Sequence, residues 1–204
     1  MELDPDLVAQ VADRAKRAIR ARMRALRQAL PTAARAARSE RICRQLLDTA
    51  EYRSARSVAL FAPQAVEVDV TQIDADARAS GKAVYYPFMD PTPTGFTTGF
   101  RRLDTLAMLA ERGRKFLEPP AGLPQAERGD IDLVVVPALA VAASGHRLGY
   151  GSGYYDATLP DVCPPGVALV VAFDFQLLAE LPASAHDVAV QTIVTDQRVL
   201  RTGG

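Results

Sequence analysis

The residues with the clearest capacity for chemistry lie in one short segment, Arg147-Leu148-Gly149-Tyr150-Gly151-Ser152-Gly153-Tyr154-Tyr155-Asp156. Three glycines at alternate positions let the backbone turn tightly and bring its N–H groups close to a ligand. Such a loop, when a helix follows it, forms a concave site suited to phosphate oxygens. Arg147 adds a fixed positive charge before the loop, and Asp156 adds a carboxylate of the kind that binds magnesium. The segment therefore predicts a phosphate site with a metal ligand beside it.

A glycine-rich surface turn with a chance arginine and aspartate would account for the same residues without any function. The preceding β-branched run, residues 131–136 closed by Pro137, favours a ligand site instead. Open α/β sheets bind ligands where a strand gives way to a loop and a helix. The loop has no Gly-Lys-Ser/Thr, so it is not a P-loop, and its GxGxG spacing differs from the GxGxxG of dinucleotide-binding folds.

The elements that must position this loop begin with two predicted helices. Apolar residues recur at three- and four-residue spacing over residues 6–29, and Pro31 ends that helix. A second helix is expected from Pro31-Thr32 to about Ala50. Lys16 and Arg20 lie four residues apart on one side of the first helix, where a solvated basic face is the default interpretation.

Alternating strands and helices are predicted after the helical pair. The expected strands are 57–61, 82–86 (closed by Pro87), 131–136, 167–173 and 192–195, the expected helices are 71–80, 103–109, 154–159 and 175–181, and residues 88–100 favour a loop or hairpin. The first strand–helix–strand unit implies a parallel pair with a right-handed crossover. We therefore expect a single α/β domain over residues 1–204, with a mainly parallel central sheet flanked by helices. Residues 1–50 form an N-terminal helical pair packed on the sheet-containing core, residues 57–196.

Composition limits the classes of function. With 49% hydrophobic residues the 204-residue chain can bury a substantial core, and it contains no apolar run long enough to span a membrane. Cys43 and Cys163 are too few for a disulfide framework or a thiolate zinc site, and no signal peptide is evident. Residues 1–56 hold 13 Lys and Arg against 7 Asp and Glu, but no aromatic residue precedes Tyr52. This pattern disfavours a nucleic-acid surface. We expect a monomeric cytoplasmic protein with small-molecule partners and no nucleic-acid or membrane partner.

The segment 147–156 resembles the signature of the 5-formyltetrahydrofolate cyclo-ligase family. Residues 15–20 resemble the basic opening of the family, and Phe61-Ala62-Pro63 through Glu67-Val68-Asp69 resembles its early strand and turn. Residues 116–119, 132–137 and 181–195 follow in the order of the family, so the resemblance spans roughly residues 15–196.

The resemblance implies a ligase that uses ATP and Mg²⁺ to cyclise 5-formyltetrahydrofolate to 5,10-methenyltetrahydrofolate, releasing ADP and phosphate. Phosphoryl transfer asks a protein mainly for positioning and charge neutralisation, and the chain offers no Cys–His or Ser-His-Asp arrangement for covalent catalysis. By resemblance, the catalytic residues are Arg147 and Asp156, and the magnesium ligands are Asp156 and Asp187. The implied ATP site is Lys16, Arg20, Arg147, Leu148, Gly149, Tyr150, Gly151, Ser152, Gly153, Tyr154 and Tyr155. The implied substrate site is Ala62, Glu67, Tyr150, Gly151, Ser152, Gly153 and Tyr154.

Some residues depart from the family pattern. Pro137-Ala138-Leu139-Ala140-Val141-Ala142 stands where relatives have Pro-Gly-Val-Ala-Phe-Asp, beside the implied substrate pocket, which leaves substrate preference open. Two alternatives to the enzyme therefore remain at this point. One is a catalytically weak paralogue that binds nucleotide and a folate-like ligand in a regulatory role, and the other is an RNA-associated adaptor that uses the basic first helix. Salt-sensitive retention of RNA would support the adaptor.

Overall fold

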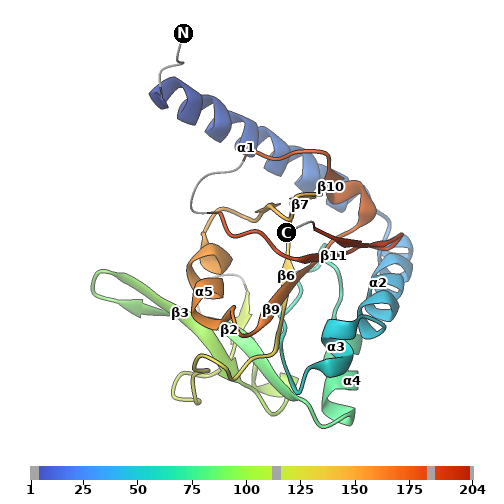
Figure 1. Ribbon diagram of the computed structural model, residues 1–204, viewed down its shortest axis with the longest axis vertical. Coiled ribbons are helices and arrows are strands. Elements are labelled where there is room, and N and C mark those ends of the chain that lie inside the picture. Colours follow the sequence, from blue (N-terminus) through green and yellow to red (C-terminus); the bar gives the residue numbers. More distant parts are fainter. Residues whose placement is uncertain (1–4, 112–115, 183–186, 203–204) are drawn as a thin grey trace.

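A seven-stranded sheet forms the centre of the molecule in the computed structural model, which describes residues 5–111, 116–182 and 187–202 (Figure 1). Its strand order is β12-β11-β9-β6-β1-β2-β3. The bounds are β1 Ser57–Ala59, β2 Ala83–Thr92, β3 Gly95–Arg102, β6 Leu133–Pro137, β9 Val167–Val171, β11 Thr192–Val194 and β12 Val199–Arg201. The five inner strands are parallel, and the two edge strands pair antiparallel. The predicted fold class, a mainly parallel sheet flanked by helices, is confirmed.

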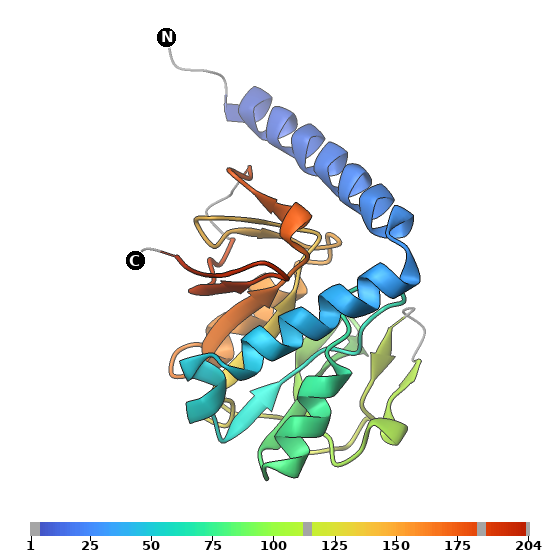
Figure 2. The ribbon, with the colours of Figure 1, turned by 90° about the vertical axis from the view of Figure 1, so that its right-hand side faces the viewer.

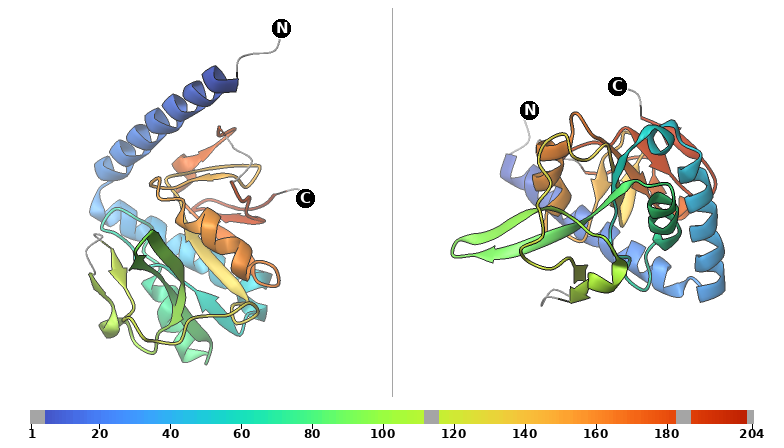
Figure 3. Two further views of the ribbon diagram at one scale, coloured as in Figure 1. Left: turned by 90° about the vertical axis from the view of Figure 1, so that its left-hand side faces the viewer. Right: turned by 90° about the horizontal axis from the view of Figure 1, so that it is seen from below.

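Helices cover both faces of the sheet, and for this reason its strands are continuous apolar runs. On one face, Leu133 and Val135 of β6 share a core with α2 (Thr32–Leu47), α3 (Ala50–Ser54) and α4 (Thr71–Ala79). On the other, Val134 and Val136 pack with α5 (Tyr154–Val162). Figure 2 shows α2 and α4 side by side over the first face, and the left view of Figure 3 shows α5 over the second. The period of two along β6 thus sends alternate valines to two separate cores.

The long first helix, α1 (Pro5–Ala29), packs mainly on a second, smaller sheet of order β10-β7-β8. Its strands are β7 Ala140–Ala142, β8 Arg147–Leu148 and β10 Leu177–Leu178. Met23 of α1 is buried against Leu139, Ala140 and Leu148. Of the predicted helical pair, α2 therefore covers the main sheet. Helix α1, which ends before Pro31, points in another direction and lies across the small sheet (Figure 2). The small sheet was not predicted, because strands of two or three residues are too short to show a periodicity.

The predicted end of a strand at Pro87 is wrong. β2 continues to Thr92 and pairs with β3 in a hairpin that extends from the body (Figure 3, right). The carbonyl of Tyr85 faces β1 and accepts the N–H of Leu60 at 2.9 Å, so the nitrogen of Pro87 faces the same side beyond the end of β1. A proline there removes no ladder hydrogen bond. Of the two structures predicted for residues 88–100, a loop or a hairpin, the hairpin is confirmed.

The helix predicted over residues 175–181 is also wrong. A single 3-10 turn, Asp174–Gln176, leads directly into strand β10. The buried side chain of Gln176 accepts the N–H of Phe173 at 2.9 Å and donates to the carbonyls of Ala138 and Leu139 at 2.8 Å each. These tertiary bonds override the local helical pattern.

The remaining elements are short. The helix predicted over 103–109 is a 3-10 turn, Leu106–Met108, followed by a β4–β5 pair, Ala110–Glu111 and Leu117–Glu118. The second predicted helix ends at Leu47, and α3 starts anew after Thr49, whose hydroxyl accepts the N–H of Tyr52. No helix within the described ranges has the length and apolarity needed to cross a membrane.

Candidate active site

A cleft of about 540 Å³ opens at the carboxyl ends of β1 and β6. The chain leaves β1 through α4 to β2 on one side, and β6 pairs with β1 on the other, so the connections diverge between these two strands. Ligands in open α/β sheets bind at such a switch point. Phe61 and Ala62, just after β1, and Pro137, the last residue of β6, line the cleft. The topology alone thus places a ligand site here.

The glycine loop forms the floor at one end of the cleft. It joins β8 to α5, and Gly151 and Gly153 have φ angles of 111° and 67°, which disfavour residues with a Cβ. Gly153 is the residue before α5, so the loop delivers a ligand to the N-terminus of a nine-residue helix. Free N–H groups and the positive end of the dipole favour phosphate there.

Arg147 and Asp156 flank the loop and hold each other. Nη2 of Arg147 lies 2.9 Å from Oδ1 of Asp156, and Nη1 donates to the carbonyl of Val188. The N–H of Val188 in turn donates to Oδ1 of Asp156 at 3.2 Å. Burial lowers the pKa of Arg147, and the negative charge of Asp156 opposes that shift. The result is a rigid, desolvated positive charge at the edge of the glycine-loop floor.

Helix α1 brings two further cations to this end. Nε of Arg20 donates to the carbonyl of Gly149 at 3.0 Å, which fixes the guanidinium against the loop. Nζ of Lys16 lies 3.1 Å from Oδ2 of Asp187. Both side chains line the cleft, so these two residues belong to the site and not to a solvated basic face.

The donors for a metal ion are two carboxylates, Asp156 and Asp187, at the same end of the cleft. The described residues contain no cluster of three or more His, Cys, Asp or Glu that could hold a metal alone. Mg²⁺ bound with a nucleotide needs only one or two carboxylates, because water and phosphate oxygens complete its shell. The residues present therefore fit an ion that arrives with phosphates, and do not fit a free-standing metal centre.

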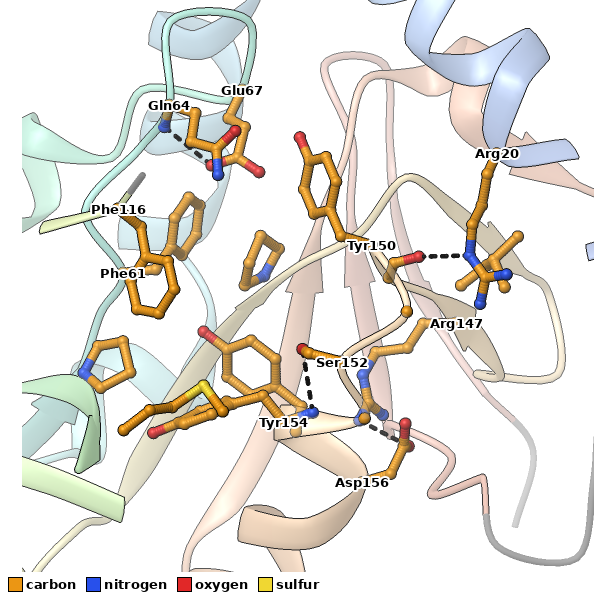
Figure 4. Close-up of a pocket in the computed structure, with 18 of the residues that line it drawn as sticks. Arg20, Phe61, Gln64, Glu67, Phe116, Arg147, Tyr150, Ser152, Tyr154 and Asp156 are labelled. Carbon is orange, nitrogen blue, oxygen red and sulfur yellow. Dashed lines mark hydrogen bonds and ion pairs between the residues drawn. The ribbon is translucent and has the colours of Figure 1, made fainter. Parts of the chain in front are cut away.

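Glu67 lines the opposite end of the cleft, and its side chain is almost completely buried. Its Oε2 accepts the N–H of Gln64 at 2.9 Å, and its Oε1 lies 3.5 Å from Nη2 of Arg27. Burial, together with the negative charge of Glu67, raises the pKa of Tyr150 to about 12. Glu67 and Tyr150 thus offer one acceptor carboxylate and one hydroxyl at this end (Figure 4).

Between the two ends the cleft has apolar walls. They are formed by Phe61, Pro87, Met89, Phe116, Leu117 and Pro137. Tyr154 also contributes, and its position is fixed because its hydroxyl donates to the carbonyl of Gly99. Its ring packs edge-on against Phe100, with centroids 6.2 Å apart. Figure 4 shows Phe61 and Phe116 on the side facing Tyr154. A flat heterocycle fits such walls.

All residues assigned to the site from the sequence line this one cleft. They are Lys16, Arg20, Ala62, Glu67, Arg147, Leu148, Gly149, Tyr150, Gly151, Ser152, Gly153, Tyr154, Tyr155, Asp156 and Asp187. The apolar wall was not assigned, since its residues look like ordinary core residues in the sequence. A signal existed for Phe61 and Pro137, which directly follow or end neighbouring parallel strands. Phe116 lies in an irregular connection, and no local pattern marks it.

Comparisons with known proteins agree with this geometry. A sequence profile of the 5-formyltetrahydrofolate cyclo-ligase family matches residues 12–196. A 5-formyltetrahydrofolate cyclo-ligase from Mycolicibacterium smegmatis is 45% identical over 80 residues, which are 39% of this chain and 41% of that protein. The one from Mus musculus is 25% identical over 92% of this chain and 97% of its own length.

A solved structure is similar over nearly the whole chain. The 5,10-methenyltetrahydrofolate synthetase of Aquifex aeolicus superposes with a TM-score of 0.80 at 28% identity, covering 93% of each chain. The profile match includes both the N-terminal helix with Lys16 and Arg20 and the glycine loop. With the same fold, a profile match over most of its length and a cleft built from the matching segments, this chain belongs to the 5-formyltetrahydrofolate cyclo-ligase family.

Proposed function

We propose that this protein catalyses the ATP-dependent cyclisation of 5-formyltetrahydrofolate to 5,10-methenyltetrahydrofolate, with release of ADP and phosphate. The observation that carries the proposal is a single cleft with two different ends. One end has cations above the glycine loop, and the other has apolar walls and the carboxylate of Glu67. The first end suits a triphosphate, and the second suits a pterin with N–H groups along one edge. Two substrates that must react with each other would meet between these ends.

The reaction needs a better leaving group than the formyl oxygen. Transfer of the γ-phosphoryl group of ATP to that oxygen breaks the bond to ADP and forms an O-phosphorylated formyl group, whose carbon carries phosphate as its leaving group. N10 then attacks this carbon, loses its proton and expels phosphate, which closes the ring. The protein supplies orientation and charge neutralisation, as in phosphoryl transfer generally. In our proposal, Lys16, Arg20 and Arg147 neutralise the phosphate charge, and Glu67 accepts hydrogen bonds from the pterin.

A magnesium ion bound with ATP would be held by Asp156, with Asp187 beside it. When bound, it supplies positive charge to the β- and γ-phosphates. The described contacts support this assignment, because both carboxylates border the phosphate end and each is already matched with a cation, Arg147 or Lys16. Releasing these cations to the triphosphate would leave the carboxylates as metal ligands.

The two alternatives gain no support. The adaptor would use the basic first helix, but two cations of that helix, Lys16 and Arg20, line the cleft. The regulatory paralogue would combine an intact phosphate end with an altered substrate pocket, but the relatives that match over most of this chain are a cyclo-ligase and a methenyltetrahydrofolate synthetase, and these matches give a regulatory role no support. We further propose that residues 1–204 act as one domain, as a monomer in the cytoplasm.

The function is tested by mixing the protein with ATP, MgCl₂ and 5-formyltetrahydrofolate and recording the absorbance of the methenyl product. We expect product only when ATP and a divalent cation are both present, with one ADP released per product. Product that persists after complete chelation would contradict the metal assignment. ATP consumption that does not depend on the folate would contradict the proposed reaction.

A further inference from the structure

Arg27 near the end of α1 is the least expected charged residue of the fold, because only 2% of it is exposed. Charged side chains are almost never fully buried unless they are paired. Arg27 does not line the cleft itself, but it lies directly behind two residues that do, Glu67 and Tyr150. Its burial therefore needs an explanation beyond the phosphate end of the site.

The contacts of Arg27 converge on the turn that carries Glu67. Its Nε donates to the carbonyl of Val66 at 2.7 Å, and its Nη2 lies 3.5 Å from Oε1 of Glu67. Among the described residues, Nη2 is buried and has no hydrogen-bond partner, so this ion pair is its interaction with Glu67. Glu67 is held on its other oxygen by the N–H of Gln64. Arg27 thus provides the counter-charge for a buried carboxylate and holds the backbone beside it.

The same guanidinium faces Tyr150, with its central carbon 5.8 Å from the ring centroid. Arg24 lies over the same ring at 5.6 Å, but it is exposed, and among the ion pairs of the described residues it is Arg27 that pairs with Glu67. Both arginines therefore lie over Tyr150, whereas Arg27 also pairs with Glu67. This difference makes Arg24 a matched control for Arg27.

We propose that Arg27 is a positioning residue for the folate end of the cleft, acting through Glu67. This inference rests on the proposed function. Arg27 holds the Glu67 carboxylate in place and directed into the cleft, where it accepts hydrogen bonds from the pterin. Arg27 meets the glycine loop at the ring of Tyr150, on the side of the loop that faces Glu67, so its removal should affect the folate site and leave the ATP site intact.

The test compares Arg27→Met, Arg24→Met, Glu67→Gln and the double variant Arg27→Met/Glu67→Gln. Methionine keeps much of the length and removes the charge. For Arg27→Met we expect KM for 5-formyltetrahydrofolate to rise about tenfold or more, with KM for ATP changed by less than about twofold. Arg24→Met should change both by less than about twofold. In the Glu67→Gln background, Arg27→Met should raise the folate KM little further, because the carboxylate that Arg27 positions has already been replaced by an amide.

Equal losses for ATP and folate, or an undiminished effect of Arg27→Met in the Glu67→Gln background, would overturn the role of Arg27. If Arg27→Met does not fold, Arg27→Lys decides in its place. Lysine keeps the charge, but its single nitrogen cannot both donate to the Val66 carbonyl and pair with Glu67 as the two guanidinium nitrogens do. The KM for folate alone should therefore rise. A wild-type protein that makes no methenyl product refutes the proposed function. An active wild type in which Arg27 and Arg24 variants behave alike refutes only this inference.

Discussion

Removing Lys16 or Arg20 gives the sharpest test of the phosphate end, because both residues come from a helix far from the glycine loop in sequence. Arg20 is held over the loop by Gly149, and a Cβ built on Gly151 would lie 3.8 Å from its guanidinium. A hydrogen bond from such a charged group to phosphate contributes about 1.5–3 kcal/mol. Arg20→Ala should therefore weaken binding of Mg-ATP roughly ten- to hundredfold.

Lys16→Ala should weaken the binding of Mg-ATP less than Arg20→Ala does. The ammonium of Lys16 already has Asp187 as a partner at 3.1 Å, so part of its interaction with a triphosphate replaces an existing ion pair. We expect a loss near the lower limit, about tenfold in affinity. The measurement is isothermal titration calorimetry with Mg-ATP at fixed ionic strength.

Arg17 and Arg22 serve as controls, since both are exposed on the same helix and neither lines the cleft. Their charges act through water and salt, and at about 0.15 M ionic strength such interactions are largely screened beyond about 8 Å. Their alanine variants should bind Mg-ATP within about twofold of wild type. Four similar losses would refute the reasoning, because α1 would then act only as a diffuse basic surface.

Three other changes test the rest of the molecule. Asp156→Asn removes the charge that pairs with Arg147, and turnover should fall at least about tenfold with an unchanged circular dichroism spectrum; wild-type turnover would contradict the catalytic assignment. Glu67→Gln should raise the Kd of 5-formyltetrahydrofolate about tenfold and leave that of Mg-ATP within about twofold, as calorimetry would show. Burial alone would raise the pKa of Asp196, but hydrogen bonds from the Asp174 N–H and Gln197 and the charge of Arg38 lower it below 3.8. A depressed pKa in the folded state stabilises the protein above pH 3.8, and this contribution is lost as pH falls further. Asp196→Asn should therefore reduce the free energy of unfolding at pH 7 and flatten its decline below about pH 4 in urea titrations.

The sequence predicted those parts of the site that depend on local backbone conformation. Alternate glycines, a preceding valine run and a following helix predicted the loop of residues 149–153 and the start of α5, and both are present. The resemblance added Lys16, Arg20, Glu67 and Asp187, which spacing alone could not assign. Their convergence on one cleft depends on how α1 crosses the small sheet, and nothing local specifies that crossing.

What the sequence did not predict depends on tertiary partners. Pro87 looks like the end of a strand until the edge position of β2 beyond Tyr85 is known. Residues 175–181 look helical until the hydrogen bonds of Gln176 to Ala138 and Leu139 are known. Arg27 resembles the other arginines of α1, and only the packing of the helix makes it a buried one.

Helix α1 links the two ends of the active site, and this arrangement has a consequence for how the site assembles. Lys16 and Arg20 reach the proposed phosphate end, where they contact Asp187 and Gly149, and Arg27 contacts Glu67 at the proposed folate end. Between them, Met23 anchors the helix in the core of the small sheet, while Leu7, Val8 and Val11 of its first turns remain exposed. A helix fixed in its second half holds Arg27 rigidly and leaves Lys16 and Arg20 on the less anchored part. The folate end is therefore preorganised by packing, whereas the phosphate end gains its cations through two contacts, Arg20 to Gly149 and Lys16 to Asp187, that a bound triphosphate would reinforce.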